Sequence, residues 1–211
     1  MILLFTIFST SFIVALSGAM MPGPLFTVAV SESSRRGFLV GPLLIAGHGI
    51  LELILVIGLM LGLAPFLKQK EVFVFIALAG SAILMWMAWG MFRALPTMSL
   101  QNNEHTETGR NLVLSGALLS IVNPYWTIWW ASIGLGYILH SMEIGKWAVF
   151  AFFCGHILGD LFWYSAVSVA VYKGKSLLSD RAYQYLIGAC AVFLAVFSCI
   201  FAYSGIQKII V

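Results

Sequence analysis

Charged side chains are scarce in this sequence. Of its 211 residues, 9% are Asp, Glu, Lys or Arg, whereas 61% are hydrophobic. A soluble globular domain carries about 25% charged and about 45–50% apolar residues. The composition therefore excludes a water-soluble enzyme and a nucleic-acid surface, and we expect neither catalysis nor a cofactor. The net charge of +3 is typical of a membrane protein with basic loops.

Cysteine is also sparse. Cys154, Cys190 and Cys199 all fall inside apolar stretches, so no disulfide framework is indicated. A redox relay is an alternative, but it would need two thiols that face each other. Inert packing is the simpler interpretation.

Six long apolar stretches lie between the short charged segments, and only Glu52 and Asp160 interrupt them with a charge. About 20 apolar residues cross a bilayer as a helix, and backbone in lipid must satisfy its own hydrogen bonds. The sequence therefore predicts an all-α membrane protein with six transmembrane helices. The expected spans are 2–21 (continuing to 30 after a break), 38–63, 72–93, 112–137, 147–171 and 184–206. The first span has no positive N-terminal region and exceeds the about 7–15 residues of a signal-peptide core, so we expect it to be retained.

Basic residues predict how the spans are oriented. Seven Lys and Arg residues lie in the first, third and fifth connections, and four lie on the opposite side. Because basic loops stay in the cytoplasm, we expect an inner-membrane protein with both termini outside. Lipid is then the expected surrounding partner, and a homo-oligomer is left open.

The two halves of the sequence resemble each other at a constant offset of 108 residues. The matching pairs are Gly37 and Gly145, Gly47 and Gly155, His48 and His156, Glu52 and Asp160, Leu53 and Leu161, and Gly80 and Gly188. In the first spans the match is looser, with Pro22 against Pro124. We therefore divide the chain into a first three-helix repeat (1–95), a polar connecting loop (96–110) and a second three-helix repeat (111–211).

Three spans is an odd number, so the second copy must enter the membrane from the opposite side. The halves would then be inverted repeats related by an axis in the membrane plane. Secondary transporters use this arrangement, with the substrate site near the midplane between the repeats.

Each repeat carries a histidine one helical turn before an acid: His48 with Glu52, and His156 with Asp160. Inverted symmetry would bring the two pairs together at half depth, where charged groups are costly and mark ion or substrate paths. Three interpretations stay open. The pairs tie helices together, or the carboxylates carry protons or bind a substrate amino group with the imidazoles tuning them, or the four side chains bind a divalent metal ion.

Two proline motifs interrupt spans. Pro22-Gly23-Pro24 breaks the first span and Asn123-Pro124 stands at the matching place in the fourth. Broken helices at membrane depth line cavities, and the N-terminus of a half-helix can hold a carboxylate. A zwitterionic amino acid would suit such an end and a facing acid, whereas a plain packing kink is the alternative. The tryptophans that follow, including Trp126, are interpreted first as interface anchors.

These motifs, together with Arg35-Arg36-Gly37 and with Asp160 near Trp163, resemble the LysE/RhtB family of amino-acid exporters over essentially the whole chain. The resemblance implies efflux of amino acids or their derivatives, driven by an ion gradient. The chain departs from the family pattern at Tyr125, where lysine commonly follows Asn-Pro, and at His48 and Glu52, where an aspartate is common. The substrate therefore stays open, and the wider superfamily also contains metal-ion exporters.

We thus expect a secondary exporter of amino acids, driven by protons and alternating its access. Its expected pathway residues are Pro22, Gly23, Pro24, His48, Glu52, Asn123, Pro124, His156 and Asp160. The alternatives are a divalent metal-ion exporter that uses His48, Glu52, His156 and Asp160, and a non-transporting membrane scaffold, which would have no cavity between the halves. No Gly-x-x-x-x-Gly-Lys motif is present, so ATP drive is not expected.

Overall fold

The computed structural model describes residues 1–67, 69–97, 111–174 and 179–210, and nearly all of them are helical. The elements are α1 (Ile2–Ala19), α2 (Pro24–Arg36), α3 (Val40–Met60), α4 (Ala64–Leu67), α5 (Lys70–Ala94), η1 (Leu95–Thr97), α6 (Leu112–Ile121), α7 (Pro124–Trp129), the π-helical turn η2 (Trp130–Gly134), α8 (Leu135–Ile144), α9 (Lys146–Gly174) and α10 (Asp180–Ile210). Most of the polar connection expected at 96–110 lies outside the described residues.

Helix lengths agree with the expected spans. Among the described residues, α1, α3, α5, α9 and α10 are each long and apolar enough to cross a membrane. The sixth candidate is α6 together with the helix from Pro124 to Ile144, and these two parts meet at an angle of 65°. The prediction of an all-helical membrane protein is confirmed, and the described helices provide five candidate spans, or six if the bent pair is one span.

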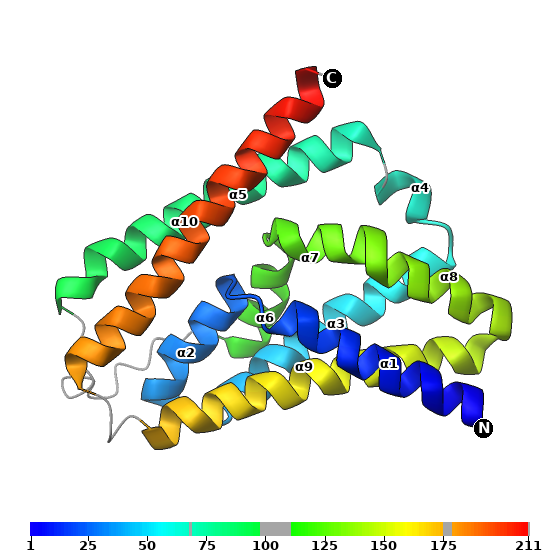
Figure 1. Ribbon diagram of the computed structural model, residues 1–211, viewed down its shortest axis with the longest axis horizontal. Coiled ribbons are helices and arrows are strands. Elements are labelled where there is room, and N and C mark those ends of the chain that lie inside the picture. Colours follow the sequence, from blue (N-terminus) through cyan, green and yellow to red (C-terminus); the bar gives the residue numbers. More distant parts are fainter. Residues whose placement is uncertain (68, 98–110, 175–178, 211) are drawn as a thin grey trace.

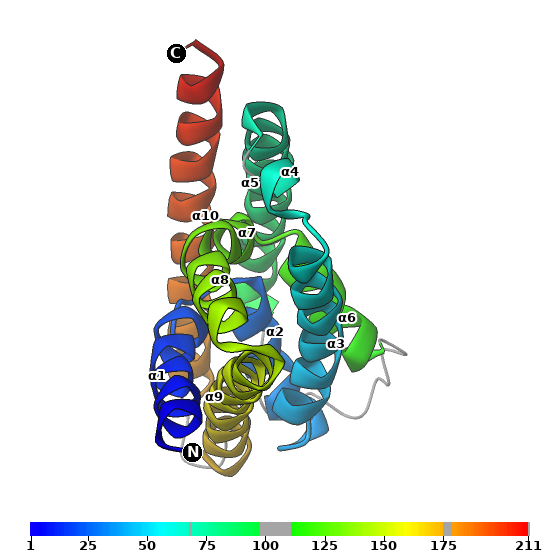
Figure 2. The ribbon, with the colours of Figure 1, turned by 90° about the vertical axis from the view of Figure 1, so that its right-hand side faces the viewer.

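The helices form two groups (Figures 1 and 2). Helices α5 and α10 pack along each other as a diagonal pair, and Ser198 Oγ donates to the carbonyl of Ser81 at 2.8 Å. In the other group α1 lies along α9 and α3 lies along α6. Ser11 Oγ of α1 donates to the carbonyl of Phe152 in α9 at 2.7 Å, so these two helices are tied by a buried polar contact as well as by packing.

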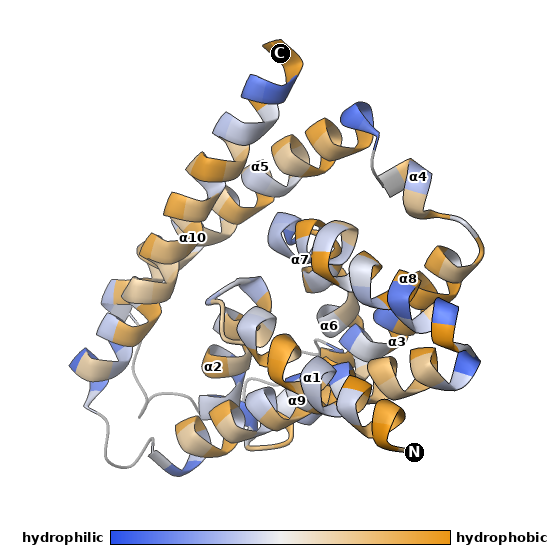
Figure 3. Ribbon diagram, turned by 45° about the vertical axis from the view of Figure 1, so that its right-hand side comes forward, coloured by the Kyte–Doolittle hydropathy of each residue, from blue (hydrophilic) through white to orange (hydrophobic). Residues whose placement is uncertain are grey.

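The outer surface of the helices is strongly apolar. Figure 3 shows hydrophobic residues along α5 and α10, with hydrophilic residues gathered near the helix ends. Trp86 is 75% exposed and Phe162 is 58% exposed. Exposed apolar area of this extent is suited to lipid rather than to water.

Both proline motifs end one helix and start another. Pro24 is the first residue of α2 and Pro124 is the first residue of α7, where the missing N–H of proline costs no helical hydrogen bond. Asn123 caps α7, because its side chain accepts from the backbone N–H of Tyr125 at 3.1 Å. Gly23 precedes α2 and provides no side-chain cap. The chain thus turns at both places instead of continuing as a kinked helix.

Candidate functional site

The two histidine–acid pairs meet in one buried cluster between α3 and α9. Nε2 of His48 lies 2.9 Å from a carboxylate oxygen of Glu52 and 3.3 Å from one of Asp160. Nε2 of His156 lies 3.2 Å from Glu52 and 3.4 Å from Asp160. Both imidazoles are therefore shared between the two acids, one of which comes from each half of the chain. Each acid side chain is at most 6% exposed.

The hydrogen bonds of His48 allow the cluster to hold one proton more or less. The hydroxyl of Ser120 lies 2.8 Å from the carbonyl oxygen of Gly116 and 2.6 Å from Nδ1 of His48, and its single hydrogen can serve one of these contacts. On the other side of the ring, Nε2 faces oxygens of Glu52 and Asp160, which only accept when ionised. If Ser120 donates to Gly116, Nδ1 donates to Ser120 and the contacts of Nε2 need one additional proton. If Ser120 donates to Nδ1, Nε2–H donates to the acids and no additional proton is needed.

Two tryptophans complete the surroundings of Glu52. The indole N–H groups of Trp126 and Trp130 donate to its Oε1 at 3.0 and 2.8 Å. Trp130 begins the π-helical turn η2, and such turns are frequent at functional sites. A Cβ on Gly134 would lie 2.5 Å from the ring of Trp130, so glycine leaves the room that this indole occupies. The turn and the glycine together place the Trp130 donor on the acid.

We expect Trp130→Phe to destabilise the protein by about 1.5–3 kcal/mol, because a hydrogen bond to a charged group contributes about that much. Phenylalanine keeps an aromatic ring, although a smaller one, but removes the N–H donor to Glu52. Thermal or chemical unfolding in detergent would measure the change. Trp86→Phe, on the exposed face of α5, is the matched control. Equal stability of the two variants would contradict the assigned contact.

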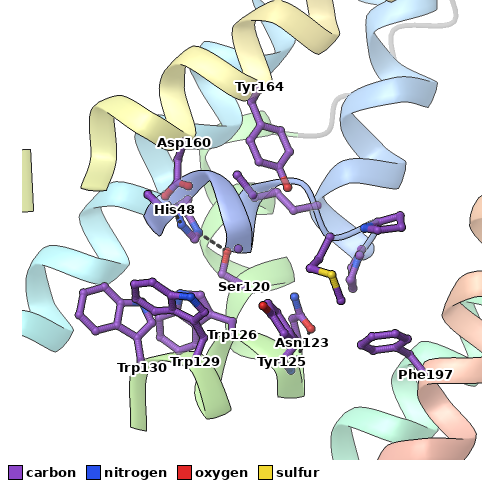
Figure 4. A pocket seen from close by; sticks show the side chains of 18 of the residues that line it. His48, Ser120, Asn123, Tyr125, Trp126, Trp129, Trp130, Asp160, Tyr164 and Phe197 are labelled. Carbon is purple, nitrogen blue, oxygen red and sulfur yellow. Dashed lines mark hydrogen bonds and ion pairs between the residues drawn. The ribbon is translucent and has the colours of Figure 1, made fainter. Parts of the chain in front are cut away.

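The cluster forms one end of a cavity of about 720 Å³, a volume that includes open space at its mouth. Figure 4 shows Asp160 and His48 on one side of it, the tryptophans below them, Asn123 farther along and Phe197 beyond Asn123. The wall is built from α1, α2, α3, α5, α6, α7, η2, α9 and α10, together with both helix breaks. The cavity thus runs from a charged end past the breaks to an apolar end.

The two breaks lie side by side in the middle of this cavity. A Cβ on Gly23 would lie 3.3 Å from Nδ2 of Asn123, so the starts of α2 and α7 converge. Leu25 lines the cavity near the uncapped start of α2. The indole N–H of Trp129, in the same wall, is buried and has no hydrogen-bond partner. Tyr164 also lines the cavity, with its hydroxyl directed toward the break (Figure 4). A ligand that accepts hydrogen bonds would satisfy such donors.

Eight of the nine residues expected from the sequence line the cavity. They are Pro22, Gly23, Pro24, His48, Glu52, Asn123, His156 and Asp160. The ninth, Pro124, starts α7 and instead packs its ring against Gly80 of α5.

Sequence reasoning missed several wall residues. The sequence predicts Trp130 as an interface anchor, but its spacing of four residues from Trp126 after a helix break places both on one helix face. Ser120, Tyr164 and Phe197 carried no sequence signal, because serine and aromatic residues are common throughout such spans.

Five to six helices that are long and apolar enough to cross a membrane, with a charged cavity buried among them, indicate a multi-pass membrane protein. The chain belongs to the family of LysE type translocators, whose sequence model matches residues 16–205. The resemblance drawn from the motifs is thereby confirmed.

Two curated relatives extend this comparison. The putative amino acid efflux protein YcgF of Bacillus subtilis (strain 168) is 22% identical over 206 residues, which cover 97% of this chain and 99% of that protein. The chemotactic transduction protein ChpE of Pseudomonas aeruginosa is 27% identical over 144 residues, which cover 67% of this chain and 70% of that protein. No solved structure matches the chain significantly.

Proposed function

We propose that this protein is a secondary exporter of amino acids or their derivatives in the inner membrane, with both termini outside. The observation that carries the proposal is the cavity, because it joins a buried charged cluster to two converging helix starts. A zwitterion fits that arrangement, with its ammonium group at the acids and its carboxylate at the break. The name of the full-length relative YcgF points in the same direction. A scaffold without a cavity between the halves is disfavoured for the same reason.

The capacity of the cluster to hold an additional proton supports coupling by exchange. A substrate ammonium group would donate to the same oxygens of Glu52 and Asp160 that now face His48. Binding of the substrate would therefore displace this additional proton, and the proton would return when the substrate leaves. His48 and His156 would hold the proton between these steps. Such an exchange carries protons inward as amino acids move outward.

We further propose that residues 1–95 and 111–211 are inverted repeats joined by 96–110. The pairing of α1 with α9 and of α3 with α6 supports this, because exchange of the two halves converts one pair into the other. A Cβ on Gly155 would overlap the carbonyl of Phe8, and a Cβ on Gly47 would overlap the carbonyl of Val113. These equivalent glycines thus make equivalent close contacts. The third and sixth spans, α5 and α10, also run in opposite directions (Figures 1 and 2).

Alternating access would follow from the division into two helix groups. The α5–α10 pair supplies Leu84, Phe193 and Phe197 to one wall, and the helix breaks and the charged cluster supply the facing wall. We propose that the pair rocks against the other helices at the breaks, where backbone hydrogen bonding is already interrupted. This movement would open the cavity first to one side of the membrane and then to the other.

Counterflow into proteoliposomes tests the export proposal. We expect liposomes loaded with unlabelled amino acid to take up labelled amino acid when they contain the protein. We also expect substrate affinity to fall as pH falls, because protons and substrate compete for the acids. Asp160→Asn should remove this pH dependence, whereas Glu143→Gln, on an exposed acid, should retain it. Wild-type rates and pH dependence in Asp160→Asn would overturn the coupling.

A divalent cation is the second candidate substrate. His48, Glu52, His156 and Asp160 each offer one ligand atom, and these atoms lie within 4.8 Å of one another in a buried site. Two imidazoles and two carboxylates suit Zn²⁺ or a similar ion. Titration of purified protein with ZnCl₂ would decide: stoichiometric binding that is lost in His48→Ala supports the cation, and absence of binding removes this candidate.

A further inference from the structure

The apolar end of the cavity provides information about the substrate beyond its amino-acid backbone. Its wall residues lie past the breaks, away from the charged cluster, as Figure 4 shows for Phe197. They are Leu84, Tyr125, Phe193, Leu194 and Phe197. The rings of Phe193 and Phe197 stack with their centroids 4.3 Å apart, and Tyr125 packs edge-on against Phe197 at 6.4 Å. This end is thus a continuous aromatic and aliphatic surface.

No lysine or arginine is found among the described residues that line the cavity, and its only acids are Glu52 and Asp160 at the opposite end. An acidic substrate side chain would therefore enter the apolar end without a cationic partner. A basic side chain would lie there without a carboxylate. Aromatic faces attract a cation by about 0.5–2 kcal/mol, which is less than the several kcal/mol needed to bury an unpaired ion. Both charged classes are disfavoured.

We propose that the substrate is an amino acid with an apolar aliphatic or aromatic side chain. This inference rests on the proposed export function and adds its specificity. The ammonium group lies at Asp160, the carboxylate at the helix break, and the side chain between Leu84 and Phe197. The unpaired indole N–H of Trp129 lies in the same cavity wall. Each part of the ligand then meets a surface of matching polarity.

Leucine, asparagine and aspartate provide a nearly isosteric series that isolates side-chain polarity. We expect leucine to inhibit counterflow at a concentration about 10–200-fold lower than asparagine, the range of discrimination that an apolar pocket achieves. Aspartate and lysine should inhibit less than asparagine. Equal inhibition by the whole series, or preference for aspartate or lysine, would overturn the specificity and leave export standing. Absence of counterflow with every amino acid would instead refute export itself.

Variants of α10 locate the side-chain site. Phe197→Ala should weaken inhibition by leucine about tenfold and leave inhibition by alanine unchanged, because only the longer side chain reaches the ring. Phe197→Leu, which keeps an apolar wall, should restore most of the preference even where the alanine variant folds poorly. Val196→Ala is the matched control, because Val196 is 51% exposed and lies on the outer face of the same helix, outside the cavity wall. Unchanged leucine preference in a folded Phe197→Ala would contradict the placement.

Discussion

Glu52→Gln is expected to reduce transport at least about 100-fold. The substitution preserves the shape of a side chain that accepts from Trp126 and Trp130 and contacts both histidines, but it removes the charge. Breaking a buried charge pair costs about 3–5 kcal/mol, which corresponds to more than a factor of 100 in an equilibrium. His48 and His156 would then share Asp160 alone.

Initial rates of counterflow in proteoliposomes would measure this loss, with equal amounts of folded protein confirmed by gel filtration. Glu143→Gln is the control, since Glu143 is an exposed acid at the end of α8. A Glu52→Gln protein that transports at the wild-type rate would show that the buried charge is not needed. Restored transport in Glu52→Asp would indicate that the charge matters more than the length of the side chain.

The second large effect is expected from adding one methyl group at a helix crossing. Gly47→Ala and Gly155→Ala should each destabilise the protein by about 1–3 kcal/mol, the cost of overpacking a well-packed interior. The new Cβ would overlap the carbonyl oxygen of Val113 in the first case and that of Phe8 in the second. Because both obstacles are backbone atoms, the helices themselves would have to separate.

Gly136→Ala is the matched control for this pair, because its Cβ would meet no atom within 4 Å. The stability of the Gly136→Ala protein should be unchanged or slightly higher, since alanine favours a helix by about 0.8–1.0 kcal/mol over glycine. Thermal unfolding of the three variants in one detergent gives the comparison. If all three shift alike, the close helix contacts at Gly47 and Gly155 do not limit stability. A similar loss at both sites would also support their equivalence in the two proposed repeats.

Much of the fold was accessible from the sequence because lipid imposes a simple rule. A long apolar stretch in lipid has to form a helix, so the few charged residues mark where each span ends. Prolines interrupt two of the spans, at Pro24 and Pro124. The cost of burying a charge likewise distinguishes Glu52 and Asp160 in the sequence alone. Their histidine neighbours followed from helical spacing alone.

Other parts of the site depend on contacts between distant segments. Trp130 reaches Glu52 because a π-helical turn and the space above Gly134 set the direction of its ring. Ser120 fixes His48 from a helix 72 positions farther along the chain. Neither contact can be predicted from a local sequence pattern, because the hydrogen-bond partner of an indole or hydroxyl group depends on which distant segment packs against it.

The sequence by itself determined a membrane-spanning helical chain, its two interruptions and the buried ionisable residues, since each is governed by the local cost of exposing polar groups to lipid. The tertiary structure alone decided which donors surround Glu52, that Pro124 packs behind the cavity, and that aromatic residues of α10 form its apolar end. Those features depend on how helices pack against one another, and the apolar surfaces that drive this packing are too alike in sequence to specify their partners.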